Sequence, residues 1–370
     1  MDIQQFEDRK RGHIRHALNP NNQAQGHSGL AQIRLEHQAL PELDFEEVRL
    51  DTLCLGQRLQ TPFFVAGMTA GHSDAAPLNH RLAAACQRRG WAMGVGSQRR
   101  QLQGFLERDR TGPTARASPF EDELDEWTAL RELAPELVLF ANVGISQVIR
   151  RPIEPLKRLV ESIRAQGLAI HLNALQECIQ PEGTPNFNGA LGAIRDVVEH
   201  LGAPVILKET GCGFSLFALQ ALIDMGLAAV DASGLGGTHW GRIEGARAAE
   251  GGEDVEMHAR AAATFADWGI PTAESTLNAG QVLAGSSART EVWASGGVRT
   301  GLDAAKLIAL GAHRVGYAQP ALAAAIEGEK ALDRWMAQQE HELRVALFCT
   351  GNARPGQLRM KEGAWKKIES

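Results

Sequence analysis

LVLFANVG, residues 137–144, is an almost unbroken apolar run that ends at a glycine. A strand with one exposed face alternates apolar and polar residues, whereas a short run like this one is typical of a strand that is buried on both faces. Parallel sheets bury both faces because helices cover them. The stretch therefore predicts one strand of a parallel sheet with helices on both sides.

The same pattern recurs along the chain, and amphipathic segments that end at glycine, such as GLDAAKLIALG (301–311), separate the runs. The predicted strands are 62–69, 91–97, 137–144, 168–174, 204–210, 228–234, 291–297 and 313–319. Because the strands alternate with helices and there are eight such units, we predict an α/β fold, a closed (β/α)8 TIM barrel.

An open, doubly wound parallel sheet is the competing arrangement, because strand order cannot be read from one sequence. Two features favour the barrel. No GxGxxG follows the first predicted strand, and polar or glycine-rich residues stand at the carboxyl end of nearly every strand, as in a barrel with one catalytic face. The long insertions after strands 2 and 6, residues 98–136 and 235–290, then rise from that same face.

We expect a single domain over residues 1–370. Residues 1–60 form an N-terminal arm and cap with a short strand region around VRLDTLCLG (48–56), residues 61–350 form the barrel, and residues 351–370 form a C-terminal tail. A helix near 320–348 follows the last strand.

Composition narrows the class of protein. A net charge of -6 argues against a general nucleic-acid binder, which needs a basic face. The start of the chain has no apolar signal region, and no stretch approaches the roughly 18 apolar residues of a membrane span. We therefore expect a cytoplasmic protein. The five cysteines are far apart, contain no CxxC pair and indicate reduced thiols: Cys54, Cys86, Cys178, Cys212 and Cys349.

HLNALQE, residues 171–177, places four polar groups where a buried strand ends. Alternation puts His171 and Asn173 on one face, while Gln176 and Glu177 lie in the loop above. A single histidine is more often a hydrogen-bonded structural group, so the convergence of four groups is what favours a site. Glu177 is a hard oxygen donor of the kind that Mg²⁺ takes, with water and substrate phosphates as its other ligands.

Glycine-rich turns end three of the last strands. ASGGVRTG (294–301) and GYAQPAL (316–322) stand where barrels repeatedly bind a phosphate, and SGLGGTHW (233–240) adds the hydroxyls of Ser233 and Thr238. Each glycine alone could be an ordinary turn residue. Their joint placement favours a phosphate site.

Lys208 ends the fifth predicted strand, where a lysine is costly unless it meets an anion or acts as a Schiff-base amine. The alternative is a structural salt bridge to Glu209 or Asp231. At the first three strand ends GMTAG (67–71), Ser97 and Asn142 form a ring of small and polar groups. Such a ring leaves room for a broad flat ligand with heteroatoms, and a flavin fits that description.

Two basic runs remain, RKRGH (9–13) and SQRR (97–100). Charge runs are usually solvated surfaces. A ligand with several phosphate charges would give both runs a purpose.

Taken together, these motifs resemble those of the type 2 isopentenyl diphosphate isomerases. RKRGH, GSQR, HLNALQE with QPEG, VILKE, SGLGGT and ASGGVRTG occur in the order found in that family, and the resemblance covers essentially the whole chain. HLNALQE together with QPEG is the most discriminating part, because many FMN barrels share the glycine pairs.

The resemblance implies an enzyme that interconverts isopentenyl and dimethylallyl diphosphate by a 1,3-allylic proton shift, with reduced FMN, Mg²⁺ and NADPH as external reductant. It implies Gln176, His171 and Lys208 as catalytic residues and Glu177 as the metal ligand. The implied substrate ligands are Arg9, Lys10, His13, Arg99, His171, Asn173 and Gln176. The implied FMN ligands are Gly67, Met68, Thr69, Ser97, Asn142, Lys208, Ser233, Thr238, Gly296, Gly297, Ala318 and Gln319.

Two alternatives stay open. The first is an FMN-dependent α-hydroxy-acid oxidase or dehydrogenase on the same barrel, for which Arg299 could clamp a carboxylate, although no histidine accompanies it in ASGGVRTG. The second is a non-catalytic sensor of phosphate ligands or an assembly protein. We expect a small-molecule diphosphate substrate and neither nucleic acid nor membrane as partner. The resemblance points to a homotetramer or homo-octamer.

Overall fold

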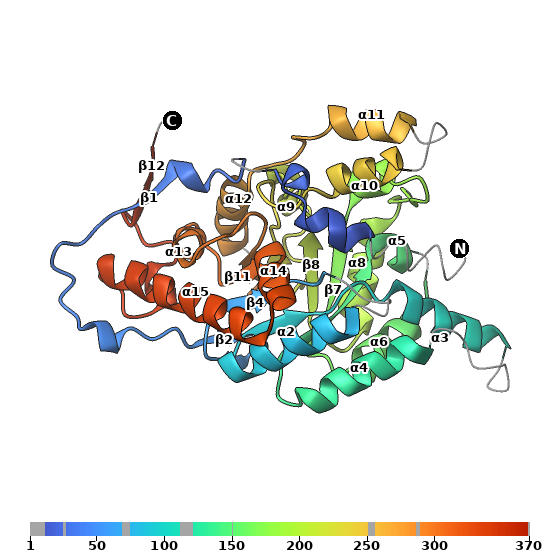
Figure 1. Cartoon of the computed structure of the whole chain (residues 1–370), viewed down its shortest axis with the longest axis horizontal. Helices are drawn as coiled ribbons and strands as arrows, with labels where there is room; N and C mark the ends of the chain where they lie inside the picture. Colours follow the sequence, from blue (N-terminus) through green and yellow to red (C-terminus); the bar gives the residue numbers. More distant parts are fainter. Residues whose placement is uncertain are drawn as a thin grey trace.

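The structure is a computed structural model, and it describes residues 12–24, 27–68, 75–111, 121–149, 151–250, 256–285 and 289–368. Eight parallel strands form a closed barrel, with each strand beside its neighbour in the chain and β11 pairing with β4 to close the ring (Figure 1). The strands are β4 (Phe63–Val65), β5 (Ala92–Gly94), β6 (Leu139–Gly144), β7 (Gly167–Leu172), β8 (Val205–Glu209), β9 (Ala229–Asp231), β10 (Glu291–Ala294) and β11 (Arg314–Tyr317). The prediction of a (β/α)8 barrel is confirmed, and the strands fall on the eight predicted runs.

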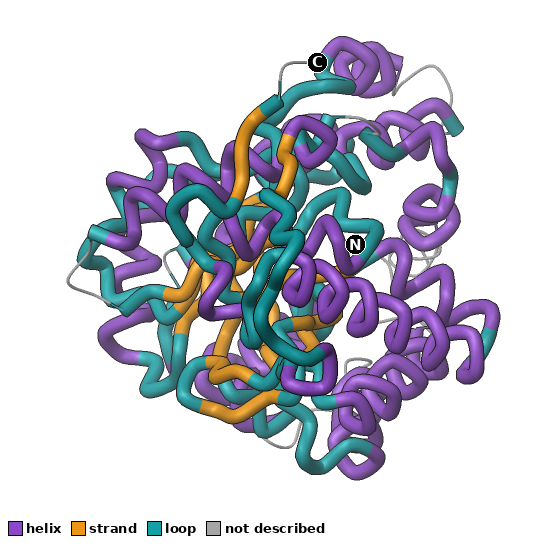
Figure 2. Tube along the Cα trace, turned by 90° about the vertical axis from the view of Figure 1, so that its left-hand side faces the viewer, coloured by secondary structure: helices purple, strands orange, loops and turns teal. Residues whose placement is uncertain are grey.

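Helices surround the barrel (Figure 2). The insertion after β5 carries α3 (Arg99–Thr111) and α4 (Glu121–Leu133), and the insertion after β9 carries α10 (Trp240–Ala249), α11 (Glu256–Thr264) and α12 (Thr272–Ala284). The remaining described helices are α2 (Ala75–Arg89), α5 (Ile145–Val148), α6 (Glu154–Ser162), α7 (Ala174–Ile179), α8 (Ala190–His200), α9 (Leu216–Gln220), α13 (Gly301–Ala309), α14 (Gln319–Glu327), α15 (Glu329–Cys349) and α16 (Pro355–Leu358). Both predicted insertions are present, and the structure shows that they contain helices.

The segment 320–348 differs from the prediction of one helix. Gly328 has φ 132° and separates α14 from α15. That backbone conformation lies outside the helical region and suits glycine, so the chain turns there instead of continuing straight. No described helix is long and apolar enough to cross a membrane.

Large apolar side chains fill the interior of the barrel at its amino end. Phe64, Phe140 and Trp293 meet with ring centroids 5.0 and 5.1 Å apart. The hairpin of β2 (Thr52–Cys54) and β3 (Gln57–Leu59) covers this layer, to which Cys54 and Leu59 belong. The predicted strand region around 48–56 thus closes the floor, and space for a ligand is left at the opposite end.

The arm and the tail meet outside the barrel. In the arm, β1 (Ile33–Leu35) pairs antiparallel with β12 (Trp365–Lys367) near the end of the chain. Figure 2 shows this pair close to the C-terminus. The predicted arm and tail therefore pair with each other. This pairing anchors the arm at β1, and the residues before β1 extend to the barrel mouth.

Candidate active site

A cavity opens at the carboxyl end of the barrel, where the polar strand ends were predicted to gather. It is bounded by strand ends, by the glycine-rich turns and by the helical segment 12–18 of the arm. The predicted site residues that line it are His13, Gly67, Met68, Ser97, Arg99, Asn142, His171, Asn173, Gln176, Glu177, Lys208, Ser233, Thr238, Gly296, Gly297, Ala318 and Gln319. The other three predicted residues, Arg9, Lys10 and Thr69, lie outside the described residues.

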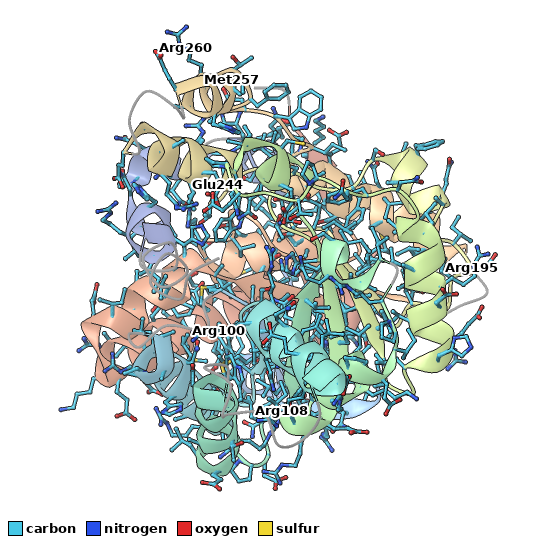
Figure 3. All side chains as sticks on the ribbon, turned by 90° about the vertical axis from the view of Figure 1, so that its right-hand side faces the viewer. Arg100, Arg108, Arg195, Glu244, Met257 and Arg260 are labelled. Atoms are coloured by element: carbon cyan, nitrogen blue, oxygen red, sulfur yellow. The ribbon has the colours of Figure 1, made fainter. Side chains whose placement is uncertain are left out.

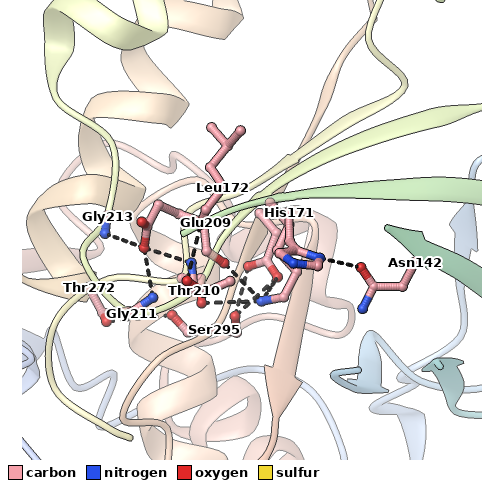
Figure 4. Close-up of polar contacts among 12 residues, drawn as sticks. Asn142, His171, Leu172, Glu209, Thr210, Gly211, Gly213, Thr272 and Ser295 are labelled. Atoms are coloured by element: carbon pink, nitrogen blue, oxygen red, sulfur yellow. Dashed lines mark hydrogen bonds and ion pairs between the residues drawn. The ribbon is translucent and has the colours of Figure 1, made fainter. Parts of the chain in front are cut away.

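His171 on β7 is oriented by Asn142 on the neighbouring β6 (Figure 4). Asn142 Nδ2 donates to the Val95 carbonyl at 3.0 Å, so its Oδ1 faces the ring of His171, whose Nδ1 lies 2.9 Å away. An amide oxygen only accepts, and Nδ1 must therefore carry the proton. Gln98, which is fully buried, accepts from the Asn142 backbone N–H and fixes this arrangement from behind.

Glu177 lies in α7, which begins directly after Asn173. The carboxylate is 6% exposed, and its oxygens accept from Asn173 Nδ2 at 3.0 Å and from the Thr184 backbone N–H at 2.5 Å. Asn173 Oδ1 is buried and has no donor among the described residues. Within that part of the chain no cluster of three or more His, Cys, Asp or Glu could hold a metal. One carboxylate beside an oxygen that lacks a donor fits Mg²⁺, which takes few protein ligands.

Glu244 on α10 was not predicted as a site residue. It connects two predicted site residues, His13 and Gln176, through its carboxylate. This carboxylate is fully buried, receives Gln176 Nε2 at 2.9 Å, lies 2.9 Å from His13 Nε2 and pairs with Arg247. Burial alone would raise the pKa of Glu244, but His13, Arg247 and Gln176 outweigh it and lower the pKa to about 2. Figure 3 labels Glu244 on this helix above the barrel.

Lys208 on β8 both lines the cavity and forms an ion pair. Its Nζ lies 3.3 Å from Asp231 Oδ2 and donates to Ser233 Oγ at 3.3 Å. The predicted alternative, a salt bridge to Asp231, is therefore present, and it does not remove the ammonium from the cavity. Ser233 has φ 34°, a left-handed conformation that is uncommon for a residue with a Cβ and recurs at functional sites.

The carboxylate of Glu209, the other predicted partner of Lys208, binds the loop that follows β8. Its Oε2 accepts the backbone N–H groups of Thr210, Gly211 and Gly213 at 2.6, 2.7 and 3.1 Å, and also that of Cys212 (Figure 4). Burial raises the pKa of Glu209 to about 7 in spite of these donors. The carboxyl group shapes the loop beside the cavity, and only its backbone carbonyl contacts Lys208 Nζ.

The glycine-rich turns pack backbone against backbone. Gly296 and Gly297 have φ 98° and 76°, and a Cβ on Gly237 would collide with the Gly297 nitrogen. A Cβ on Gly67 would likewise collide with the Val95 carbonyl. Both the backbone conformation and the close approach require glycine at these positions. The exposed backbone of the turns leaves space for a flat ligand that carries a phosphate.

Arg299, which was considered only for a hydroxy-acid site, lies between the glycine turns and the start of α14. Its Nη1 donates to Gln319 Oε1 at 2.9 Å and its Nη2 to Gln23 Oε1 at 3.1 Å. Both acceptors are neutral amides, and burial lowers the pKa of Arg299. A guanidinium at a cavity wall beside the N-terminus of a nine-residue helix fits an anionic group.

Known proteins resemble the chain over nearly its whole length. Isopentenyl-diphosphate delta-isomerase of Legionella pneumophila (strain Corby) is 46% identical over 351 residues, 95% of this chain and 96% of that protein. The protein of the same name from Bdellovibrio bacteriovorus is 46% identical over 364 residues, 97% of each chain. The chain belongs to the isopentenyl-diphosphate delta-isomerase family. A match of residues 190–363 to the FMN-dependent dehydrogenase family agrees with the FMN-dependent type of this isomerase family.

Solved structures share the fold of this isomerase family member. A mutant flavocytochrome b2 with benzoylformate superposes with a TM-score of 0.66 at 17% identity, covering 98% of this chain and 84% of the other. A mandelate oxidase mutant with (S)-mandelic acid gives 0.65 at 17% identity, covering 100% and 99%. At such identity the likeness is one of fold.

Proposed function

We propose that this isomerase family member interconverts isopentenyl and dimethylallyl diphosphate, with reduced FMN and Mg²⁺ bound together in the cavity at the barrel mouth. The observation that carries the proposal is that residues suited to two different ligands line the same cavity. The glycine turns with Lys208 and Arg299 suit a flavin phosphate and ring, while Arg99, His171 and Glu177 suit a diphosphate and its metal.

On the flavin side, the backbone of the turns and α14 would hold the phosphate. Arg299 would add a charge-assisted contact, because its present acceptors are uncharged. Lys208 would face the ring and favour a negative charge on it. The proposed FMN ligands that the structure describes are Gly67, Met68, Ser97, Asn142, Lys208, Ser233, Thr238, Gly296, Gly297, Ala318 and Gln319, and Thr69 is proposed with them.

On the substrate side, Glu177 would bind Mg²⁺ bridged to the diphosphate, and Arg99 and His13 would supply positive charge or N–H donors. His171 and Asn173 extend the same wall. Arg9 and Lys10 are proposed to join them from the arm. The single carboxylate fits this arrangement because the diphosphate supplies the oxygen ligands that Mg²⁺ prefers.

The reaction adds a proton at a terminal methylene and removes one from the carbon next to the oxygen-bearing carbon. Bound in its reduced form, FMN supplies an electron-rich ring and a proton beside the alkene. Gln176 is held at both ends of its amide, with Nε2 donating to Glu244 and Oε1 accepting from Asn173 Nδ2 at 3.3 Å. It is therefore fixed in orientation and would position the proton transfer.

An anaerobic assay tests the proposal. Isopentenyl diphosphate in D₂O with FMN, Mg²⁺ and dithionite or NADPH is followed by proton NMR. We expect dimethylallyl diphosphate with deuterium in a methyl group, and none without reductant. If flavin binds and is reduced but no conversion occurs, the proposal is wrong; bleaching of the flavin by lactate or glycolate would then favour the hydroxy-acid oxidase, and tight diphosphate binding alone would favour the sensor.

Three finer points rest on membership of the family. We propose NADPH as the external reductant, a cytoplasmic location, and a homotetramer or homo-octamer of the 40.0-kDa chain. Light scattering on a sizing column measures the assembly mass, and a monomer would contradict the last point.

A further inference from the structure

The segment 19–24 of the arm pairs with the turn after β9. Gln23 and Thr238 form an isolated antiparallel bridge. The Ala24 N–H donates to the Gly237 carbonyl at 2.7 Å, and the His239 N–H donates to the Asn22 carbonyl at 3.0 Å. Backbone contacts alone therefore attach the segment to the wall of the proposed flavin site.

The side chain of Gln23 makes a second set of contacts. It is 5% exposed, and its Nε2 donates to the Ala17 carbonyl at 2.8 Å and lies 3.2 Å from Thr238 Oγ1. Its Oε1 accepts from Arg299 Nη2 at 3.1 Å. A carbonyl only accepts and a guanidinium only donates, so the amide has one orientation in which both partners are satisfied.

These contacts connect the proposed substrate side of the cavity with the proposed flavin side. Ala17 lies near the end of the helical segment 12–18, which carries His13 on the substrate side. Thr238 and Arg299 line the flavin side. The amide nitrogen of Gln23 thus contacts both the arm helix and Thr238, while its amide oxygen contacts Arg299 in the wall of the proposed phosphate site.

We propose that Gln23 is a positioning residue that orients Arg299 and Thr238 toward the flavin phosphate and couples that phosphate to the arm helix, an inference that rests on the proposed function. A buried amide must keep its hydrogen bonds, since an unmatched donor or acceptor is costly. Any displacement of Arg299 or Thr238 therefore reaches the end of the helix through Gln23, and occupancy of the phosphate site stabilises the helix that carries His13.

The first test compares FMN with riboflavin, which lacks the phosphate. For Gln23→Ala we expect FMN binding, measured by quenching of flavin fluorescence in the full-length protein, to weaken about tenfold, the loss of one hydrogen bond to a charged group. Riboflavin binding stays the same. An equal effect on both flavins would overturn the proposal, because it would indicate a general loss of structure.

Asn22→Ala is the matched control. Asn22 is also 5% exposed, and its Nδ2 donates to the His16 carbonyl of the same arm segment at 3.0 Å, but among the described residues its side chain forms no hydrogen bond with Thr238 or Arg299. We expect Asn22→Ala to weaken FMN binding much less than Gln23→Ala does, because it loosens the arm but keeps the contact between Gln23 and Arg299. If it weakens FMN as much as Gln23→Ala does, the effect comes from the arm in general and the proposal is overturned.

Gln23→Glu sharpens the test. The carboxylate still accepts from Arg299 but cannot donate to Ala17, and it brings a negative charge to the proposed phosphate site. We expect a larger loss of FMN affinity than for Gln23→Ala and no loss for riboflavin. FMN affinity equal to that of the unmodified protein would contradict the placement of the phosphate.

The coupling itself is read from hydrogen exchange of residues 12–18. FMN should slow exchange there in the unmodified protein and not in Gln23→Ala, whereas riboflavin should have no effect in either. An FMN effect that survives in Gln23→Ala overturns the coupling. Absence of any flavin binding by the unmodified protein would instead contradict the proposed function, so the two failures are distinguishable.

Discussion

The two ends of the barrel both bury charge, and they do so in opposite ways. At the floor, Arg314 is fully buried 3.6 Å from Glu291, whose carboxylate also accepts from Trp293 Nε1 and from the Leu55 backbone N–H. At the mouth, Lys208 pairs with Asp231 at 3.3 Å but still borders the cavity.

The surroundings explain the difference. Aromatic rings and the hairpin β2–β3 enclose the floor, where the Glu291 carboxylate accepts two protein N–H groups and the guanidinium nitrogens of Arg314 have no hydrogen-bond partner among the described residues. At the mouth the turns are rich in glycine, and the side chain of Arg299 donates to two neutral amides. The floor is thus closed to solvent by large side chains, whereas the mouth stays open as the cavity where we propose that the ligands bind.

Trp293→Ala, a change at the floor, should have the largest effect on stability. Removing a buried tryptophan that packs on Phe64 and Phe140 leaves a cavity and should lower the free energy of unfolding by about 3–5 kcal/mol. Urea unfolding measures this. FMN affinity of the folded protein should change little, and a variant as stable as the unmodified protein would contradict the role given to the floor.

Glu177→Gln, a change at the mouth, should impair catalysis instead of stability. We expect turnover to fall roughly 10²–10³-fold, as for loss of one electrostatic group at a reaction centre, together with loss of the response to Mg²⁺. FMN should still bind, because Glu177 lies on the substrate side. Unchanged turnover and metal response in an anaerobic assay would remove Glu177 from the proposed site.

Glu244 predicts an acid sensitivity that originates at the mouth. The pKa of its carboxyl group is lowered to about 2 from the usual 4.5, so its stabilising contribution is present above pH 4.5 and is lost as the pH falls toward 2. The loss amounts to about 3 kcal/mol. Urea unfolding between pH 5 and pH 2.5 should show a steeper loss of stability than for Glu244→Gln, and parallel curves would contradict this assignment.

Arg260→Ala provides the smallest effect, away from both ends. Arg260 pairs with Glu256 on α11 with side chains 77% and 59% exposed, and Figure 3 shows it at the outer edge of the molecule. Exposed pairs contribute little, so stability should change by less than about 0.5 kcal/mol and activity should be unchanged. A loss comparable with that of Trp293→Ala would show that α11 belongs to a larger contact surface.

The barrel could be predicted because its signals are local. Each strand is a short apolar run and each polar strand end follows it directly, so LVLFANVG and HLNALQE carry their own information. The break at Gly328 was missed because a glycine inside an apolar helical pattern is compatible with either continuation or a turn.

Residues whose partners are distant in sequence could not be found in this way. Glu244 is one acid among the charges of α10, and its contacts come from His13 and Gln176. In the sequence Gln23 is an ordinary polar residue of the arm, and only the folded structure shows that it contacts Arg299. Arg299 stood in a recognised motif, but only its two neutral partners favour an anion site.

The division of the mouth into a flavin side and a diphosphate side is the central claim. A crystal structure with FMN, Mg²⁺ and isopentenyl diphosphate tests it most directly. The account predicts the flavin phosphate at Arg299, Thr238 and the start of α14, and the metal-bound diphosphate at Glu177 and His171. A flavin phosphate at Glu177 or His171, or a diphosphate at Arg299, would contradict it.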